Sequence, residues 1–258
     1  MLDYNPSSQT ADHINAVIDA ALVAREAATV PRQYLGGSRL GHPCERALQF
    51  EYTQAPKDEG PGFAGRTLRI FGIGHALEDL AVDWLRAAGF DLHTRRADAH
   101  GDGEGHQFGF SVAGGRIRGH VDGVFADGPA IPGMAFPALW ECKTMNAKSW
   151  RETASKGVAA SKPIYAAQIA VYQAYMDAAV PGVADNPALF TAINKDTAEL
   201  HHELVTFDAA LAQRMTDRAV RILQSTDAGD LLPRIATQPE FHECRFCAWP
   251  KRCWSLPA

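Results

Sequence analysis

Apolar residues recur at helical spacing in several segments of this chain. Residues 10–28 combine strong helix formers with an apolar stripe through Ile14, Val17, Ile18 and Leu22, which predicts a helix. The same period predicts a helix over 67–88, which Gly89 would end. Further helices are predicted over 45–52, over 163–179 and over 208–225.

Short apolar runs between turn residues predict strands. They cover 90–94, 107–112, 116–125 and 138–145, with a further pair over 189–194 and 203–207. Gly114-Gly115 indicates a hairpin, and Gly101, Gly103 and Gly105 indicate a turn before it. Helices and strands intermixed in this order predict an α/β fold with a central mixed sheet flanked by helices.

Composition places the chain among ordinary globular proteins. Of its 258 residues, 46% are hydrophobic and 21% are charged, and no linker is long enough to separate two domains. Five cysteines and an N-terminus without an apolar leader predict a cytoplasmic protein without a disulfide framework. Charged residues interrupt every apolar stretch, so no membrane role is expected. The net charge of −5 does not favour nucleic acid, although a carboxylate-rich metal site makes a nuclease acidic.

The cysteines are unevenly distributed. Cys44 stands alone near the start, whereas Cys244, Cys247 and Cys253 lie in the last fifteen residues with Cys-x2-Cys-x5-Cys spacing. Soft sulfur ligands suit iron–sulfur or zinc rather than magnesium. The distant fourth cysteine and the five-residue gap favour a cluster, and a structural zinc held by all four thiolates is the alternative.

Two predicted strands carry residues that suit hydrolytic chemistry. Glu141 and Lys143 lie two apart on the strand over 138–145 and share a face, so Cys142 and Trp140 should point into the core on the other face. Asp122 is expected on the strand over 116–125. Two carboxylates beside an ammonium group are what is needed to hold Mg²⁺ or Mn²⁺ at a scissile phosphate. Lys143 would then orient or deprotonate the attacking water and offset negative charge.

Two helices add candidate residues to this site. His75 would supply a nitrogen ligand that favours Mn²⁺, whereas Glu78, three residues further on the same face, is interpreted as a solvated or supporting carboxylate. Gln168 and Tyr172 lie one helical turn apart and would reach phosphate or base. The alternative for that pair is the polar edge of an amphipathic helix.

Four motifs, taken in order, resemble the RecB-type branch of the PD-(D/E)xK nucleases: Gly74-His75, Gly119-x2-Asp122, Glu141-x-Lys143 and Gln168-x3-Tyr172. The cysteine layout resembles the iron–sulfur subgroup, in particular the stand-alone CRISPR-associated RecB-like exonucleases and their phage relatives. Val121 precedes Asp122 where the superfamily name has proline, a form usual in the RecB branch.

The resemblance implies a restriction-endonuclease-like fold and a role for each motif residue. It implies a [4Fe-4S] cluster on Cys44, Cys244, Cys247 and Cys253. It also implies a Mn²⁺ or Mg²⁺ site at His75, Asp122, Glu141 and the Cys142 carbonyl, catalysis by Asp122, Glu141 and Lys143, and DNA binding by Gln168 and Tyr172.

By the same resemblance the chain is expected to be a metal-dependent exonuclease on single-stranded DNA, acting 5′ to 3′, with recombination or CRISPR-adaptation proteins as candidate partners. One nuclease domain is expected over 1–258: a helical region over 1–65, a nuclease core over 66–225 and a cysteine segment over 226–258. The cluster would be structural rather than catalytic. A non-cleaving DNA-binding partner and a zinc-stapled nuclease or hydrolase are the alternatives.

Overall fold

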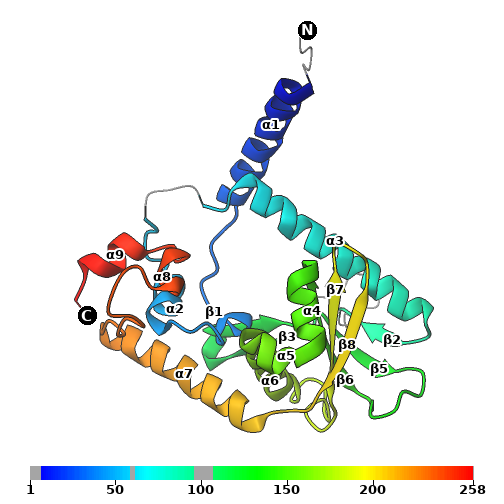
Figure 1. Ribbon diagram of the computed structural model, residues 1–258. Coiled ribbons are helices and arrows are strands. Elements are labelled where there is room, and N and C mark those ends of the chain that lie inside the picture. The colour runs from blue at the N-terminus through cyan, green and yellow to red at the C-terminus, as the bar shows by residue number, and fades with distance from the viewer. Residues whose placement is uncertain (1–6, 59–61, 96–106, 258) are drawn as a thin grey trace.

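The computed structural model describes residues 7–58, 62–95 and 107–257, and Figure 1 shows its helices arranged around two sheets. The predicted turn at Gly101, Gly103 and Gly105 lies outside the described residues. The helices are α1 Ser7–Ala27, α2 Glu45–Tyr52, α3 Gly65–Ala87, α4 Ala147–Lys156, α5 Val158–Ser161, α6 Pro163–Met176, α7 Ala209–Ala228, α8 His242–Arg245 and α9 Pro250–Ser255.

The larger sheet has five strands in the order β2-β5-β6-β7-β8. These are β2 Asp91–His93, β5 Gly123–Asp127, β6 Ala138–Met145, β7 Ala188–Asn194 and β8 Leu200–Val205. β6 and β7 run parallel, whereas the other neighbours are antiparallel. A smaller sheet has the order β1-β4-β3, from β1 Leu35–Gly36, β4 Ile117–His120 and β3 Gly109–Val112. The expected mixed sheet is therefore present, with a second sheet beside it.

The predicted strand over 116–125 is wrong in one respect, because the chain changes sheets in its middle. β4 ends at His120 and β5 begins at Gly123, so Asp122 lies at the junction rather than within a strand. The junction is held by the backbone N–H of Val121, which donates to the Phe108 carbonyl at 2.9 Å, and by the Asp122 carboxylate, which accepts from the backbone of β6. These long-range bonds replace the ladder that one continuous strand would have formed.

The five-stranded sheet is covered on both faces. α3 packs on one face, where Ala81 and Val82 join a cluster that contains Trp140 and Cys142. Helices α5, α6 and α7 contribute to the core on the other face, together with Leu139. The predicted alternation along β6 is confirmed, because Trp140 and Cys142 are buried against α3.

Most predicted elements are present. α2 and β6 have the predicted bounds, the Gly114-Gly115 hairpin joins β3 to β4, and β7 pairs with β8. Helices α4 and α5 were not predicted; the Asn146 side chain caps α4 by accepting from the Ser149 backbone N–H at 2.8 Å. Within the described residues, no helix has the length and apolar character needed to cross a membrane.

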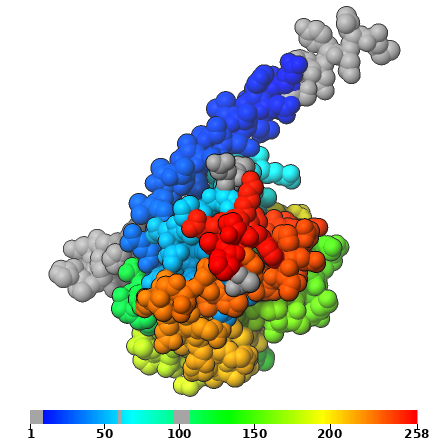
Figure 2. All heavy atoms as spheres, turned by 90° about the vertical axis from the view of Figure 1, so that its left-hand side faces the viewer, coloured from blue at the N-terminus to red at the C-terminus, as the bar shows by residue number. Residues whose placement is uncertain are grey.

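The two ends of the described chain lie at different places on the molecule. α1 extends away from the body, and its contact with α3 includes an ion pair between Asp19 and Arg69 at 2.8 Å. The C-terminal segment folds back onto α2, and Figure 2 shows these two segments side by side on one face. The fold therefore brings the segment that carries Cys44 next to the one that carries the other three cysteines of the predicted set.

Candidate active site and cysteine pocket

Glu141 lies at the centre of a group of charged side chains. Its side chain is fully buried on β6, where one carboxylate oxygen accepts from the Lys143 ammonium group. The other oxygen, Oε2, is buried without a hydrogen-bond partner. Burial and the nearby charge of Asp122 together raise the pKa of Glu141 to about 8, against the opposing effect of Lys143. A buried carboxylate oxygen left without a partner is costly and indicates a position for a cation.

Asp122 is held against β6 from the junction of the two sheets. Its Oδ2 accepts from the backbone N–H of Cys142 at 2.8 Å and lies 3.8 Å from the Lys143 Nζ. The change of sheets thus brings the aspartate beside the Glu-x-Lys pair. The predicted trio of Asp122, Glu141 and Lys143 therefore comes together in one place.

Lys143 contacts both Glu141 and Asp122. Besides the two carboxylates, its Nζ donates to the Cys142 carbonyl at 3.1 Å and lies 5.6 Å from the centre of the Tyr165 ring. Burial alone would lower the pKa of Lys143, but the charges of Glu141 and Asp122 outweigh it and raise the pKa. The side chain is therefore an ammonium ion at neutral pH, suited to neutralising negative charge rather than to accepting a proton.

Glu78, on α3, belongs to the same electrostatic group. Burial and the charge of Asp122 raise its pKa to about 7, with an opposing effect from Lys143. The sequence interpretation gave it only a supporting or solvated role and preferred His75, which is exposed on the same helix. The sequence did hold a signal for Glu78: it lies three residues from His75 and therefore on the same face of α3 as the predicted ligand.

Gln168 and Tyr172 lie on α6 and are both nearly buried, at 5% and 3% exposure. Tyr172 forms a hydrogen bond with Ser38 and packs edge-on against Phe110, with ring centres 5.5 Å apart. Burial raises the pKa of Tyr172, and the charge of Glu141 adds to the effect. Tyr172 is thus part of the wall beside the carboxylates, and DNA binding by this pair stays a prediction.

The donors around Glu141 suit a hard cation. Within residues 7–58, 62–95 and 107–257, no three His, Cys, Asp or Glu side chains are arranged to hold one metal ion. The oxygen that lacks a partner on Glu141, the carboxylate of Asp122 and the Cys142 carbonyl are nevertheless the oxygen ligands that Mg²⁺ and Mn²⁺ prefer. The residues present therefore fit a divalent cation. Lys143 contacts the same oxygen-bearing groups that would bind it.

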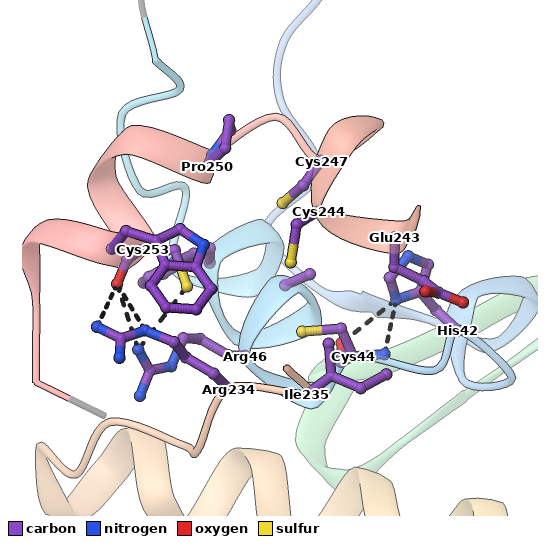
Figure 3. Close-up of a pocket in the computed structure, with 13 residues that line it drawn as sticks. His42, Cys44, Arg46, Arg234, Ile235, Glu243, Cys244, Cys247, Pro250 and Cys253 are labelled. Carbon is purple, nitrogen blue, oxygen red and sulfur yellow. Dashed lines mark hydrogen bonds between the residues drawn. The ribbon is translucent and has the colours of Figure 1, made fainter. Parts of the chain in front are cut away.

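The four predicted cluster cysteines line one pocket between α2, α8 and α9 (Figure 3). Cys44 comes from the residue before α2 and the other three from the C-terminal segment. Burial raises the pKa of Cys244, and the charges of Cys44 and Cys253 raise it further. Burial and the same two thiols also raise the pKa of Cys247.

All four thiols line this pocket, although they are among the described residues of which no three are arranged to hold one metal ion. Four thiolates placed together repel one another unless a cation lies among them, and metal binding removes their protons. Four cysteines at one pocket are the type of donor that iron–sulfur and zinc centres use. The fifth cysteine, Cys142, is buried in the core, where burial raises the pKa of its thiol.

The chain was compared with known proteins in three ways. No family model matches it, and no curated protein does. Among solved structures, the alkaline exonuclease LHK-Exo from Laribacter hongkongensis matches with a TM-score of 0.48 at 15% identity over 81% of this chain and 93% of that one. The same exonuclease in complex with dAMP matches with a TM-score of 0.48 at 15% identity over 83% and 93%. The protein SSO0001 matches with a TM-score of 0.46 at 15% identity over 91% and 93%.

Proposed function

We propose that this chain is a metal-dependent DNA exonuclease. One observation carries the proposal: the buried Glu141 keeps a carboxylate oxygen without a partner beside Asp122 and Lys143. Carboxylates that converge with an ammonium group suit phosphodiester hydrolysis, which needs charge neutralisation at the phosphate and an activated water. The motif resemblance to the RecB-type nucleases supports the same reaction.

Each residue of the site has a distinct task in this proposal. Asp122 and Glu141 hold the divalent cation, with the Cys142 carbonyl as a further oxygen ligand and His75 as the predicted nitrogen ligand. The cation supplies Lewis-acid activation of water and of the phosphate when it is bound. Lys143 stays protonated and offsets the charge that develops on the phosphate oxygens. Gln168 and Tyr172 border the site and position the DNA strand.

The four pocket cysteines hold a [4Fe-4S] cluster in this proposal. The cluster connects the loop before α2 to the C-terminal segment and has a structural role, because phosphodiester hydrolysis transfers no electrons. The four thiols that share one pocket support a metal centre, and the spacing of the cysteines supports iron–sulfur over zinc.

A digestion assay tests the nuclease proposal. Purified protein is incubated with labelled single-stranded and duplex DNA and with Mg²⁺, Mn²⁺ or Co²⁺. Metal-dependent release of nucleotides is expected from the wild type and not from Glu141→Gln. The matched control is Glu152→Gln, which removes a partly exposed carboxylate that pairs with Lys156 and Lys162, and it should digest normally. DNA binding without cleavage under all three metals would favour the non-cleaving DNA partner.

Polarity and strand preference follow from the motif resemblance and need a separate test. Substrates blocked at either the 5′ or the 3′ end identify the end from which digestion starts. The proposal expects single-stranded DNA to be digested from its 5′ end. Digestion that requires a free 3′ end would contradict the polarity while leaving the nuclease activity in place.

Anaerobic purification tests the cluster. The expected product is a brown protein that contains iron and acid-labile sulfide in equal amounts. A colourless protein with one zinc per chain would show the zinc-stapled alternative instead. Glu141→Gln should keep the iron and sulfide content of the wild type, because Glu141 is not among the residues that line the cysteine pocket.

A further inference from the structure

Two arginine side chains converge on Cys253 at one side of the cysteine pocket (Figure 3). Arg46 comes from α2 and Arg234 from the segment after α7. Arg46 Nη1 lies 3.8 Å from the Cys253 sulfur and 3.5 Å from its carbonyl oxygen. Arg234 donates to the same carbonyl through Nε at 3.2 Å and Nη2 at 3.1 Å. The two guanidinium groups therefore share one acceptor.

Arg46 is an unusual residue to find at full burial. Its side chain has 0% exposure, and its Nη2 has no hydrogen-bond partner. Its other contacts are backbone carbonyls, those of Leu232 and Pro257. Arg234 is partly buried and its guanidinium lies 4.5 Å from the centre of the Trp254 ring. Neutral groups thus leave one donor of Arg46 unsatisfied, and carbonyl groups do not neutralise the charge of either arginine.

A carboxylate does not supply the missing countercharge within the described ranges. There, described carboxylates form ion pairs with other arginines, such as Arg39, Arg69, Arg116, Arg218 and Arg221, and not with Arg46 or Arg234. Glu243 also lines the pocket, but Figure 3 places it at the opposite end, beside His42. A buried cation without a countercharge is strongly destabilising, so an anion is expected next to the pair.

Four thiolates bound to one metal centre provide that anion. Their combined charge exceeds the charge of either a [4Fe-4S] core or a zinc ion, so the centre as a whole is a dianion. Arg46 already contacts one of its four sulfur atoms. Its Nη2, buried and without a partner, is a donor available to the sulfur of the centre.

We propose that Arg46 and Arg234 form the countercharge of an anionic tetrathiolate centre in this pocket, an inference that rests on the proposed metal site of the four cysteines. The pair holds the Cys253 end of the ligand set and neutralises the centre. With a [4Fe-4S] cluster, it also raises the reduction potential, because the reduced cluster carries one more negative charge and gains more from nearby cations.

The test uses anaerobically purified holoprotein and compares Arg46→Gln and Arg234→Gln with the wild type. An equilibrium redox titration followed by visible absorbance measures the potential. In each neutral variant the equilibrium constant for reduction should be roughly tenfold lower than in the wild type. For one electron this corresponds to a reduction potential lower by about 59 mV. Arg46→Lys keeps the charge and should restore most of the wild-type potential. Arg245→Gln, which removes an exposed arginine next to Cys244, should shift it much less because solvent screens that charge.

Potentials equal to the wild type in both neutral variants, at full iron content, would overturn the inference. If Arg46→Gln does not fold, Arg234→Gln and Arg46→Lys still decide the outcome. If the bound metal is zinc, competition with a chelator replaces the redox titration: a roughly tenfold loss of zinc affinity in the neutral variants supports the countercharge, and unchanged affinity overturns it. A wild type that binds neither iron nor zinc also overturns it. DNA digestion is scored separately, so failure of the nuclease proposal remains distinguishable.

Discussion

Metal binding at Glu141 should depend steeply on pH. The pKa of this buried carboxyl is raised to about 8, so the group is largely protonated at pH 6. A cation that binds the carboxylate must displace this proton, and metal affinity therefore falls as the pH decreases below about 8. Lowering the pH from 8 to 6 is the perturbation, and the apparent Kd for Mn²⁺ is the quantity that changes.

The size of the effect follows from the pKa. Two pH units below a pKa of about 8 leave on the order of one carboxylate in a hundred free of its proton, which costs ~2.7 kcal/mol of binding free energy. The protein without metal responds in the opposite direction. Because the folded pKa is raised above the ordinary value of 4.5, the folded state binds the proton more tightly than the unfolded state, and stability falls as the pH rises from 4.5 to about 8.

Thermal unfolding with and without Mn²⁺ measures both effects at once. At pH 8, Mn²⁺ at a hundred times its Kd should stabilise the wild type by ~2.7 kcal/mol, which raises Tm by roughly 5–10 °C in a chain of this size. At pH 6 the same concentration should give a rise of only one or two degrees. Glu141→Gln should show little rise at either pH, whereas Glu152→Gln should behave as the wild type. A Tm rise that is the same at pH 6 and pH 8 would refute the assignment of Glu141 as a metal ligand.

Three further predictions concern other parts of the molecule. Glu78→Gln should lower DNA digestion roughly tenfold to a hundredfold, as loss of a group that supports metal ligands does, while the exposed Asp79→Asn should leave the rate unchanged. Gly119→Ala should lower the free energy of unfolding in urea by ~1–3 kcal/mol, because a Cβ at this position would lie 2.5 Å from the Phe110 ring. Cys44→Ser should abolish the visible absorbance of the anaerobic protein and lower its Tm; an unchanged spectrum would exclude Cys44 as a ligand.

The sequence was most informative where local periodicity decides the structure. β6 was predicted with its observed bounds because an apolar run between turns has few alternatives. Its alternation also placed Glu141 and Lys143 on one face and Cys142 on the other. The order of the strands could not be read in the same way, since the pairing of β6 with β7 joins residues about fifty positions apart.

The less predictable features depend on contacts between distant segments. Asp122 was expected within a strand, whereas it lies where the chain leaves one sheet for another and where its side chain accepts a hydrogen bond from the β6 backbone. Glu78 was interpreted as a solvated or supporting carboxylate, yet burial raises its pKa, and that burial depends on how α3 packs on the sheet. The approach of Arg46 and Arg234 to the same Cys253 carbonyl could not be predicted from the sequence, because the two residues lie far apart in the chain.

The segment from β1 to α2 links the two sites physically. At its start, Ser38 hydrogen-bonds Tyr172, whose own pKa is affected by Glu141. In its middle, Gly41 packs so closely on α6 that a Cβ there would lie 2.9 Å from Ile164 Cα, so only glycine fits without displacing the helix. At its end, Cys44 enters the cysteine pocket. A metal centre that fixed Cys44 would therefore also restrain the backbone against which α6 is packed. In this way a structural centre would stabilise the position of α6 beside the carboxylate site.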